Sequence, residues 1–208
     1  MQKFSTGKFG KYEVISLRNQ MIYFESHSKY DIERIYKLTE PLCKDYPKHK
    51  EWFYEKHLPN IKAAYMPDEW RDILFIREPT TYIPDSLNVI GAICLKKTPY
   101  EKKICCLYVD EHWRNKGVGS LLLQCAFVWL DTNMPLITLP DYKLEEMKPF
   151  IDKFGWKLEE TIDNAYGNGH KELCFNGKLV KDPEPKREQI TIEEVLKLTN
   201  KGNKKSAE

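Results

Sequence analysis

Hydrophobic residues gather along the chain into runs and stripes whose lengths and spacing predict the main secondary-structure elements. The apolar runs at 72–77, 88–97 and 103–109 have the length and composition of strands. Residues 118–130 form an apolar run that is too long for one strand, so they predict a buried helix. A further short strand is expected at 135–139. The middle of the chain therefore predicts four strands and one buried helix.

The N-terminal part predicts an extended segment followed by two helices. Residues 12–25 are expected to be extended, with a turn or bend at 18–20. Apolar positions in 31–44 recur at helical spacing, and Ser28 is expected to cap that helix. A second helix, opened by a proline, is expected over 47–59.

The later part of the chain predicts one more helix and a β-hairpin. Residues 143–154 are expected to form a helix that ends at Gly155. The segments 157–166 and 171–175 flank the sequence Gly-Asn-Gly at 167–169, which is typical of a hairpin turn.

The sequence changes character after residue 179. The stretch KDPEPKREQ is a charged, proline-containing linker, and Thr191 with Glu194 three residues later predicts the start of a short amphipathic helix. We expect this helix to dock on its own domain, and partner binding is the alternative. The predicted organisation is an N-terminal extension or extra strand at 1–20, one main domain at 21–179, and a linker, helix and solvated tail at 180–208.

Composition narrows the class of protein. The 208 residues are 41% hydrophobic and 12% aromatic, which is enough for a substantial core in one large domain. The 33 basic residues nearly balance the 31 acidic ones, so nucleic acid is not expected as an obligatory partner. No apolar run is long enough to cross a membrane, and the N-terminus lacks the apolar core of a secretory signal. We therefore expect a cytoplasmic protein without membrane contact, as a monomer or homodimer.

Six cysteines are present, but their spacing predicts neither a metal site nor a disulfide framework. No pair has the Cys-x-x-Cys spacing, and no neighbouring histidine completes a zinc pattern. We expect buried, reduced thiols and no metal. The adjacent Cys105 and Cys106 suggest a covalent route, which we disfavour because no activating base is evident in the sequence.

The segment VDEHWRNKGVGS at 109–120 carries the most specific chemical signal. It joins a predicted strand to the predicted buried helix and contains Arg-x-x-Gly-x-Gly, from Arg114 to Gly119. A helix N-terminus exposes unpaired N–H groups that bind phosphates. Glycines let the backbone approach an anion, and Arg114 and Lys116 add positive charge. The segment therefore predicts a pyrophosphate site, with an ordinary helix cap as the alternative.

Two other nucleotide-binding loops fit this segment poorly. A dinucleotide fingerprint needs a third glycine, but Leu122 stands at that position. A P-loop needs Gly-Lys-Ser/Thr after its second glycine, whereas Ser120 and Leu121 follow here. We therefore disfavour an enzyme that uses ATP or NAD.

The segment resembles the acetyl-CoA-binding motif of GNAT-superfamily N-acetyltransferases, written Arg/Gln-x-x-Gly-x-Gly/Ala after a strand with Leu-x-Val. Residues 148–156 are similar to a later segment of the same family. The likeness covers roughly 21–179 and implies an α/β (α+β) fold: a mixed, mostly antiparallel sheet of six to seven strands, flanked by helices and splayed near the middle. The motif does not identify the acceptor.

The resemblance implies that acetyl-CoA is the cosubstrate and that an acetyl group passes from it to a primary amine by direct attack. The backbone of the loop would hold the pyrophosphate, the preceding strand would pair with the pantetheine arm, and an N–H near Val109 would stabilise the oxyanion. The implied cofactor-binding residues are Leu107, Tyr108, Val109, Arg114, Asn115, Lys116, Gly117, Val118, Gly119 and Ser120.

Direct attack requires a base for the amine and an acid for the thiolate, and here the chain departs from the family pattern. Ile151 stands where a tyrosine acid is frequent, and residues 139–141 lack an asparagine that is common in the family. Tyr142, Tyr166 and Tyr108 are the candidate acids, with water as the alternative.

Glu111 is the candidate base, because it follows the motif strand closely. Its neighbours Asp110 and His112 have weaker claims. For each of these residues, an ordinary surface role is the alternative.

Two classes of function remain open from the sequence. The first is an acetyl-CoA-dependent N-acetyltransferase acting on a small molecule, a protein or peptide amine, or the aminoacyl end of a charged tRNA, as family toxins do. The second is a non-catalytic CoA-binding or partner-binding module, suggested by the missing tyrosine and asparagine. Acetyl transfer above the uncatalysed rate distinguishes them.

Overall fold

The computed structural model describes residues 7–9, 11–23, 25–62, 69–79 and 88–179. The linker and amphipathic helix expected after residue 179 lie outside the described residues.

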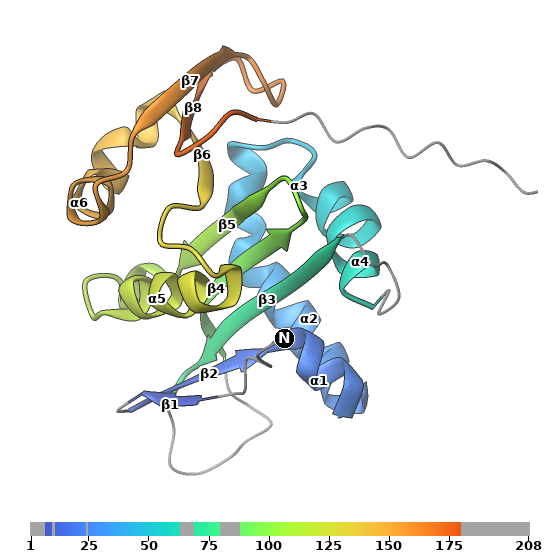
Figure 1. Cartoon of the computed structure of the whole chain (residues 1–208). Coiled ribbons are helices and arrows are strands. Elements are labelled where there is room, and N and C mark those ends of the chain that lie inside the picture. The colour runs from blue at the N-terminus through green and yellow to red at the C-terminus, as the bar shows by residue number, and fades with distance from the viewer. Residues whose placement is uncertain (1–6, 10, 24, 63–68, 80–87, 180–208) are drawn as a thin grey trace, which may run out of the picture.

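The described strands form one mixed sheet (Figure 1). They are β1 (Gly7–Phe9), β2 (Tyr12–Ser16), β3 (Trp70–Arg77), β4 (Val89–Lys97), β5 (Lys102–Val109), β6 (Leu136–Pro140), β7 (Leu158–Asp163) and β8 (Lys171–Phe175). Their order is β1-β2-β3-β4-β5-β6-β8-β7, and β5–β6 is the parallel pair among otherwise antiparallel neighbours. The expected mixed, mostly antiparallel sheet flanked by helices is confirmed, and the three-residue β1 brings the described strands to eight.

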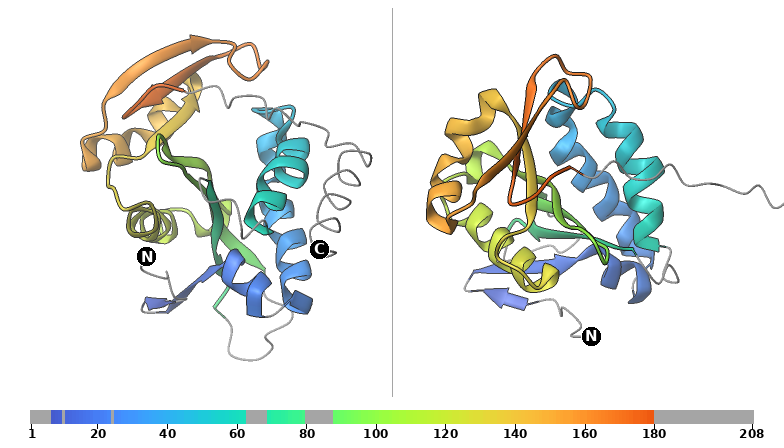
Figure 2. Two further views of the ribbon diagram at one scale, coloured as in Figure 1. Left: turned by 45° about the vertical axis from the view of Figure 1, so that its right-hand side comes forward. Right: turned by 45° about the horizontal axis from the view of Figure 1, so that its top comes forward.

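Helices cover both faces of the sheet, as the left view of Figure 2 shows. The helices are α1 (Leu17–Tyr23), α2 (Glu25–Thr39), η1 (Glu40–Lys44), α3 (His49–Glu51), η2 (Trp52–His57), α4 (Leu58–Lys62), η4 (Glu111–Trp113), α5 (Val118–Leu130), η5 (Asp141–Lys143) and α6 (Leu144–Phe154). One core forms between α1–α4 and the sheet, where Ile35 and Phe53 pack with Phe75. The other forms between α5–α6 and the opposite face, where Leu122 packs with Ile93.

The first helices begin earlier than the sequence pattern indicates. Residues 12–25 do not stay extended, because β2 ends at Ser16 and α1 follows at once. The Ser16 hydroxyl accepts a hydrogen bond from Asn19 N (3.2 Å) and donates to Asp72 Oδ2 (2.7 Å). Asp72 Oδ1 also accepts from Arg18 N (3.1 Å), so a carboxylate from β3 fixes the start of α1.

The helix expected over 31–44 occupies Glu25–Thr39 instead, so Ser28 lies inside it rather than at its cap. The remaining five residues continue as the 3₁₀ turn η1. A proline at the start of that turn removes a backbone N–H and disfavours the α conformation in the residue before it, which explains the change of helix type.

The second half of the chain follows the sequence pattern closely. The buried helix predicted at 118–130 is α5, and α6 ends at Gly155 with the positive φ of 66° that favours glycine at this position. The predicted hairpin is β7–β8, and Gly167 and Gly169 both have positive φ in its loop.

Candidate active site

The sheet opens between β5 and β6. These parallel strands pair at two positions, Lys103 with Leu136 and Ile104 with Ile137. β4, on the other side, pairs with β5 up to Val109. The sheet is therefore splayed between the C-terminal halves of β5 and β6, as the resemblance implies.

A β-bulge lies where the two strands part. Cys94 on β4 pairs with Cys106, and the next residue of β4, Leu95, pairs with Ile104, which leaves Cys105 as the extra residue of β5. A bulge bends its strand and increases the local twist. Residues 107–109 beyond it are half-exposed although β5 is a central strand. The bulge therefore marks the beginning of the opening between the strands.

One backbone N–H is aimed into this opening. The Asp110 N–H donates to the Ile90 carbonyl (3.0 Å), so Asp110 points its polar groups toward β4. Alternate residues of a strand point these groups to opposite sides, so Val109 points its N–H away from β4. The Val109 carbonyl, on that same side, accepts a hydrogen bond from Arg114 Nε (3.3 Å).

The glycine-containing loop ends in an uncapped helix N-terminus. Asn115 (φ 59°) and Gly117 (φ 85°) adopt left-handed backbone conformations, and Gly117 is the N-cap of α5. Among the described residues, no side-chain hydrogen bond caps this helix end. The first N–H groups of α5, at residues 118–120, lack acceptors within the helix and carry the positive end of its dipole.

Contacts with β2 hold the loop in place. The Tyr12 hydroxyl donates to the Lys116 carbonyl (3.2 Å), and the Tyr12 ring meets Trp113 edge-on with centroids 6.3 Å apart. The Lys116 ammonium lies 5.0 Å from the Trp113 ring centroid. The loop is thus fixed by the N-terminal hairpin, which precedes it by about a hundred residues in sequence.

Of the two glycines near the start of α5, one allows the helix to lie close to the sheet. A Cβ at Gly91 on β4 would lie 2.7 Å from Val118 Cγ1, which is closer than real contacts allow. A Cβ at Gly119 would lie 3.5 Å from Phe150 of α6 and 3.6 Å from Val109, which are ordinary contacts. Gly91 is therefore required for packing, whereas Gly119 leaves the helix end open without being sterically obligatory.

Positive side chains surround this helix end. Arg114 and Lys116 are both exposed. The Arg114 guanidinium carbon lies 5.9 Å from the Tyr108 ring centroid, and its Nη1 is 3.5 Å from Glu146 Oε1 on α6. Unpaired N–H groups, a helix dipole and two cations beside an opening in the sheet together fit a diphosphate joined to a linear arm.

A buried carboxylate lies on the face of the sheet opposite α5. Glu172 on β8 is 1% exposed, and it pairs with Pro140, the last residue of β6, where β6 has already parted from β5. Its Oε1 accepts a hydrogen bond from the Tyr46 hydroxyl (3.2 Å). Its Oε2 is buried and has no hydrogen-bond partner among the described residues. Burial raises the pKa of Glu172 to about 7.

Tyrosines and one lysine complete this second group. The Tyr166 ring, from the β7–β8 loop, packs edge-on against Tyr46 with centroids 5.3 Å apart, and its hydroxyl lies 3.4 Å from Thr138 Oγ1 on β6. Burial acts to lower the pKa of Lys103 on β5, but Tyr166 and neighbouring acidic groups outweigh it and raise that pKa overall. We call Glu172, Tyr46, Thr138, Tyr166 and Lys103 the carboxylate cluster.

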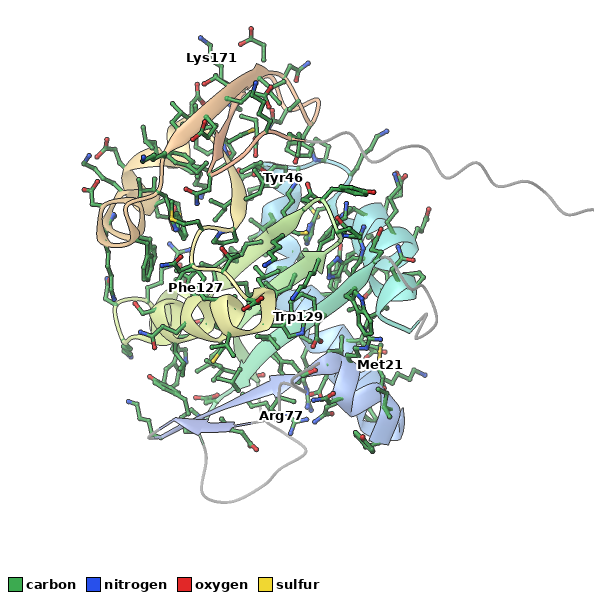
Figure 3. The ribbon with its side chains drawn as sticks, viewed as in Figure 1. Met21, Tyr46, Arg77, Phe127, Trp129 and Lys171 are labelled. Carbon is green, nitrogen blue, oxygen red and sulfur yellow. The ribbon has the colours of Figure 1, made fainter. Side chains whose placement is uncertain are left out.

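Polar contacts tie the rim of the carboxylate cluster together. The Tyr142 hydroxyl donates to the Asp45 carboxylate, and Asn168 Nδ2 donates to the Asp45 carbonyl (2.9 Å). The rings of Tyr142 and His170 pack with centroids 4.6 Å apart. These contacts join η5, the β7–β8 loop and the segment before α3. Figure 3 shows Tyr46 between the hairpin and the helical layer.

The structure separates the predicted catalytic residues. Tyr166 belongs to the carboxylate cluster, and Tyr142 lies at its rim, where burial and the Asp45 carboxylate raise its pKa. Glu111 is exposed in η4, directly before the glycine-containing loop. Burial also raises the pKa of the Cys105 thiol, which opposes formation of a nucleophilic thiolate.

Sequence reasoning missed Glu172 and the role of Tyr46. The signal for Glu172 lies in the strand KELCF, where Leu173 and Phe175 face the core and Glu172 shares the other face with Cys174. Alternation alone assigns such a glutamate to solvent. Its burial depends on Tyr46 and Tyr166, which come from distant loops.

Comparison with known proteins shows the family. The sequence model described as the acetyltransferase (GNAT) family matches residues 39–155, which is more than half of the chain, so this protein belongs to that family. A search among curated proteins found no match.

Solved structures show the same fold at low sequence identity. A GNAT-family structure from Desulfovibrio desulfuricans is 15% identical, covers 70% of this chain and 90% of its own, and has a TM-score of 0.51. NAA60 of Arabidopsis thaliana, in complex with a bisubstrate analogue, is 12% identical over 70% of this chain and 90% of its own, with a TM-score of 0.53. PaiA N-acetyltransferase of Thermoplasma acidophilum, in complex with coenzyme A, is 16% identical over 78% and 97%, with a TM-score of 0.51.

The described residues contain neither a membrane-spanning helix nor a cluster of metal ligands. Within the described ranges, no helix is both long and apolar enough to span a membrane. No group of three or more potential metal ligands occurs in the same part of the chain.

Proposed function

We propose that this protein transfers an acetyl group from acetyl-CoA to a primary amine by direct attack. The observation that carries the proposal is the uncapped N-terminus of α5, preceded by a cationic loop with two left-handed residues and set beside the opening between β5 and β6. The N–H groups of residues 118–120 would bind the diphosphate, with Arg114 and Lys116 as charge partners.

The pantetheine arm would lie along the open edge of β5. Polar backbone groups of Leu107 and Val109 face the side from which β6 has parted, where they could pair with the amides of the arm as an added strand would. The Val109 carbonyl already accepts a hydrogen bond from Arg114 Nε. The Val109 N–H would then polarise the thioester carbonyl and stabilise the developing oxyanion, an interaction worth about 3 kcal/mol in comparable sites.

The amine would approach from the face that carries the carboxylate cluster. The glycine-containing loop and the carboxylate cluster lie on opposite faces of the sheet, beside the same opening. The thioester of acetyl-CoA and the acceptor amine would therefore meet within this opening. Tyr166 and Tyr142 remain candidates for the proton donor to the thiolate, and Glu111 remains a candidate base.

Isothermal titration with acetyl-CoA tests the donor site. Wild type should bind one equivalent, and Gly117→Asp/Gly119→Asp should abolish binding while the protein stays folded by circular dichroism, because two carboxylates would stand where the phosphates bind. Acetylated product in a mass-spectrometric screen of primary amines would then support catalysis. Absence of binding by folded wild type would refute the donor site, and binding without any acetylated amine would favour a non-catalytic module.

A further inference from the structure

Glu172 is poorly placed for a purely structural role. Glu172 is 1% exposed, the hydroxyls of Tyr46 and Thr138 act on its carboxylate, and Oε2 has no hydrogen-bond partner among the described residues. A buried carboxylate without a full set of partners is costly, so such groups are normally paired or carry out a function. A ligand that supplies the missing donor would remove this cost.

The surroundings of Glu172 favour a cation as that donor. The rings of Tyr46 and Tyr166 pack together beside it, and aromatic rings attract ammonium groups. At the rim, Asp45 and Asp141 carry negative charge, with Lys143 Nζ 3.9 Å from Asp45 Oδ2 and His170 Nδ1 3.7 Å from Asp141 Oδ1. Within the cluster, the charge of Lys103 also acts on Glu172 and lowers its pKa.

Glu172 lies close to the opening in the sheet. Glu172 pairs with Pro140 at the end of β6, and Thr138, two residues earlier on β6, lies on the same face of the sheet. β6 has already parted from β5 at this level. A group bound at the free oxygen of Glu172 would therefore lie beside the opening, on the face opposite the α5 loop.

We infer that Glu172 is a catalytic residue that binds the ammonium group of a cationic acceptor and removes one proton from it. This inference rests on the proposed acetyl transfer and adds a substrate class, primary amines that are protonated at neutral pH. It also adds a residue that the sequence did not single out.

The acceptor enters the site as the ammonium R–NH₃⁺. The Glu172 carboxylate takes one proton and leaves R–NH₂, whose lone pair attacks the thioester carbon and forms the C–N bond. The C–S bond breaks as the carbonyl reforms, and the CoA thiolate departs. The nitrogen loses its second proton, which ends on the thiolate sulfur, and Glu172 returns its proton to solvent.

A matched pair of acceptors separates proton removal from binding. 2-Phenylethylamine and O-benzylhydroxylamine differ by one methylene replaced by oxygen, and at neutral pH the first is an ammonium whereas the second is a neutral amine. The neutral amine needs no base before attack. Glu172→Gln should therefore lower kcat/KM for 2-phenylethylamine by about 100-fold or more and change that for O-benzylhydroxylamine by less than about 3-fold.

Controls distinguish this role from a structural one. Glu159→Gln removes an exposed carboxylate from the neighbouring strand β7 and should change neither rate. Acetyl-CoA affinity of Glu172→Gln should equal that of wild type, which shows that the variant is folded and that the donor site is intact. An equal loss of rate with both acceptors, or no loss with either, would overturn the inference.

A second measurement does not require turnover. Difference infrared spectroscopy of the CoA-bound protein near pH 6 should show loss of a protonated carboxyl band when 2-phenylethylamine is added, and no such loss with O-benzylhydroxylamine or in Glu172→Gln. An unchanged band in wild type at saturating 2-phenylethylamine would overturn the inference, whether or not acetyl transfer is observed. Acetyl transfer that persists in Glu172→Gln would leave the proposed function intact and refute only the role of Glu172.

Discussion

The two faces of the opened sheet carry sites of opposite character. On the α5 side, the exposed cations Arg114 and Lys116 lie beside a helix end whose first N–H groups have no acceptors within the helix. On the other side, Glu172 is buried under tyrosines and its Oε2 lacks a partner among the described residues. The first arrangement suits a polyanion and the second suits a single cation. Under the proposed function, anionic acetyl-CoA and a cationic amine would bind on opposite faces of the sheet. The two substrates would then enter without competing for one site.

The two sites also differ in how they are built. The α5 site is made mainly of one continuous segment, and its donors are backbone groups. The carboxylate cluster draws side chains from β5, β6, β8 and two loops. A site formed by backbone groups keeps its ligand contacts after many substitutions that preserve the backbone conformation. A site formed by side chains loses a contact when one functional group is removed. Substitutions should therefore affect the two faces differently.

On the α5 face, the largest effect is expected from replacing the exposed cation Arg114. Arg114→Gln should weaken acetyl-CoA binding by about 10- to 100-fold, because hydrogen bonds to charged groups contribute about 1.5–3 kcal/mol. It should leave the preference between cationic and neutral acceptors unchanged. Titration calorimetry at low and high salt measures the affinity for acetyl-CoA. The control is Lys157→Gln, which removes an exposed positive charge elsewhere. Unchanged affinity in Arg114→Gln would contradict the assignment.

A smaller effect is expected from crowding the seat of α5. Gly91→Ala places a methyl group 2.7 Å from Val118 Cγ1, so the start of the helix must shift. Overpacking of this kind typically costs about 1–3 kcal/mol of folding stability. Chemical denaturation should show the loss in Gly91→Ala but not in Gly177→Ala, where the added methyl meets Leu136 at 3.8 Å. Equal stability of the two variants would show that α5 is not constrained at this point.

The pH dependence of transfer should report the carboxylate cluster. The pKa of Glu172 is raised to about 7 by burial, and the ionised form is the one that accepts a proton. kcat/KM for 2-phenylethylamine should therefore fall as the pH drops below about 7, whereas that for O-benzylhydroxylamine should not. The groups that face Glu172 are Tyr46, Lys103, Asp141, Cys174 and Tyr142.

Two neighbours of Glu172 should shift the pH below which kcat/KM for 2-phenylethylamine falls, which we call the acidic limb of the pH profile. The charge of Lys103 and the hydrogen bond from Tyr46 both lower the pKa of Glu172. Each of the variants Lys103→Met and Tyr46→Phe should therefore raise the pKa of Glu172 and shift the acidic limb of the pH profile to higher pH. A shift to lower pH in either variant would indicate that another group controls the profile.

The smallest effect is expected at Glu111. This glutamate is exposed beside the glycine-containing loop, on the side of the donor. If Glu172 removes the proton, Glu111→Gln should change kcat/KM for 2-phenylethylamine by less than about 3-fold, as is usual for surface substitutions. Steady-state kinetics decides between the two carboxylates. A loss of about 100-fold in Glu111→Gln alone would return the role of base to Glu111.

The sequence by itself determined most elements of the second half of the chain, because they depend on local patterns, and the same kind of pattern predicts the diphosphate site at α5. The apolar run at 118–130 specified α5, and Gly155 specified the end of α6. The sequence predicts this site because its proposed donors are consecutive N–H groups, whose positions follow from Arg114, Gly117 and Gly119 alone.

Tertiary structure decided where α1 begins, where the sheet opens and which carboxylate is buried. Asp72, more than fifty residues later, fixes the start of α1 through Ser16. The bulge at Cys105 arises from pairing with β4. Glu172 is separated from Tyr46 by 126 residues, and no local pattern encodes that contact. Burial and pKa are properties of assembled neighbours, so a residue such as Glu172 acquires its chemistry only when the distant segments pack together.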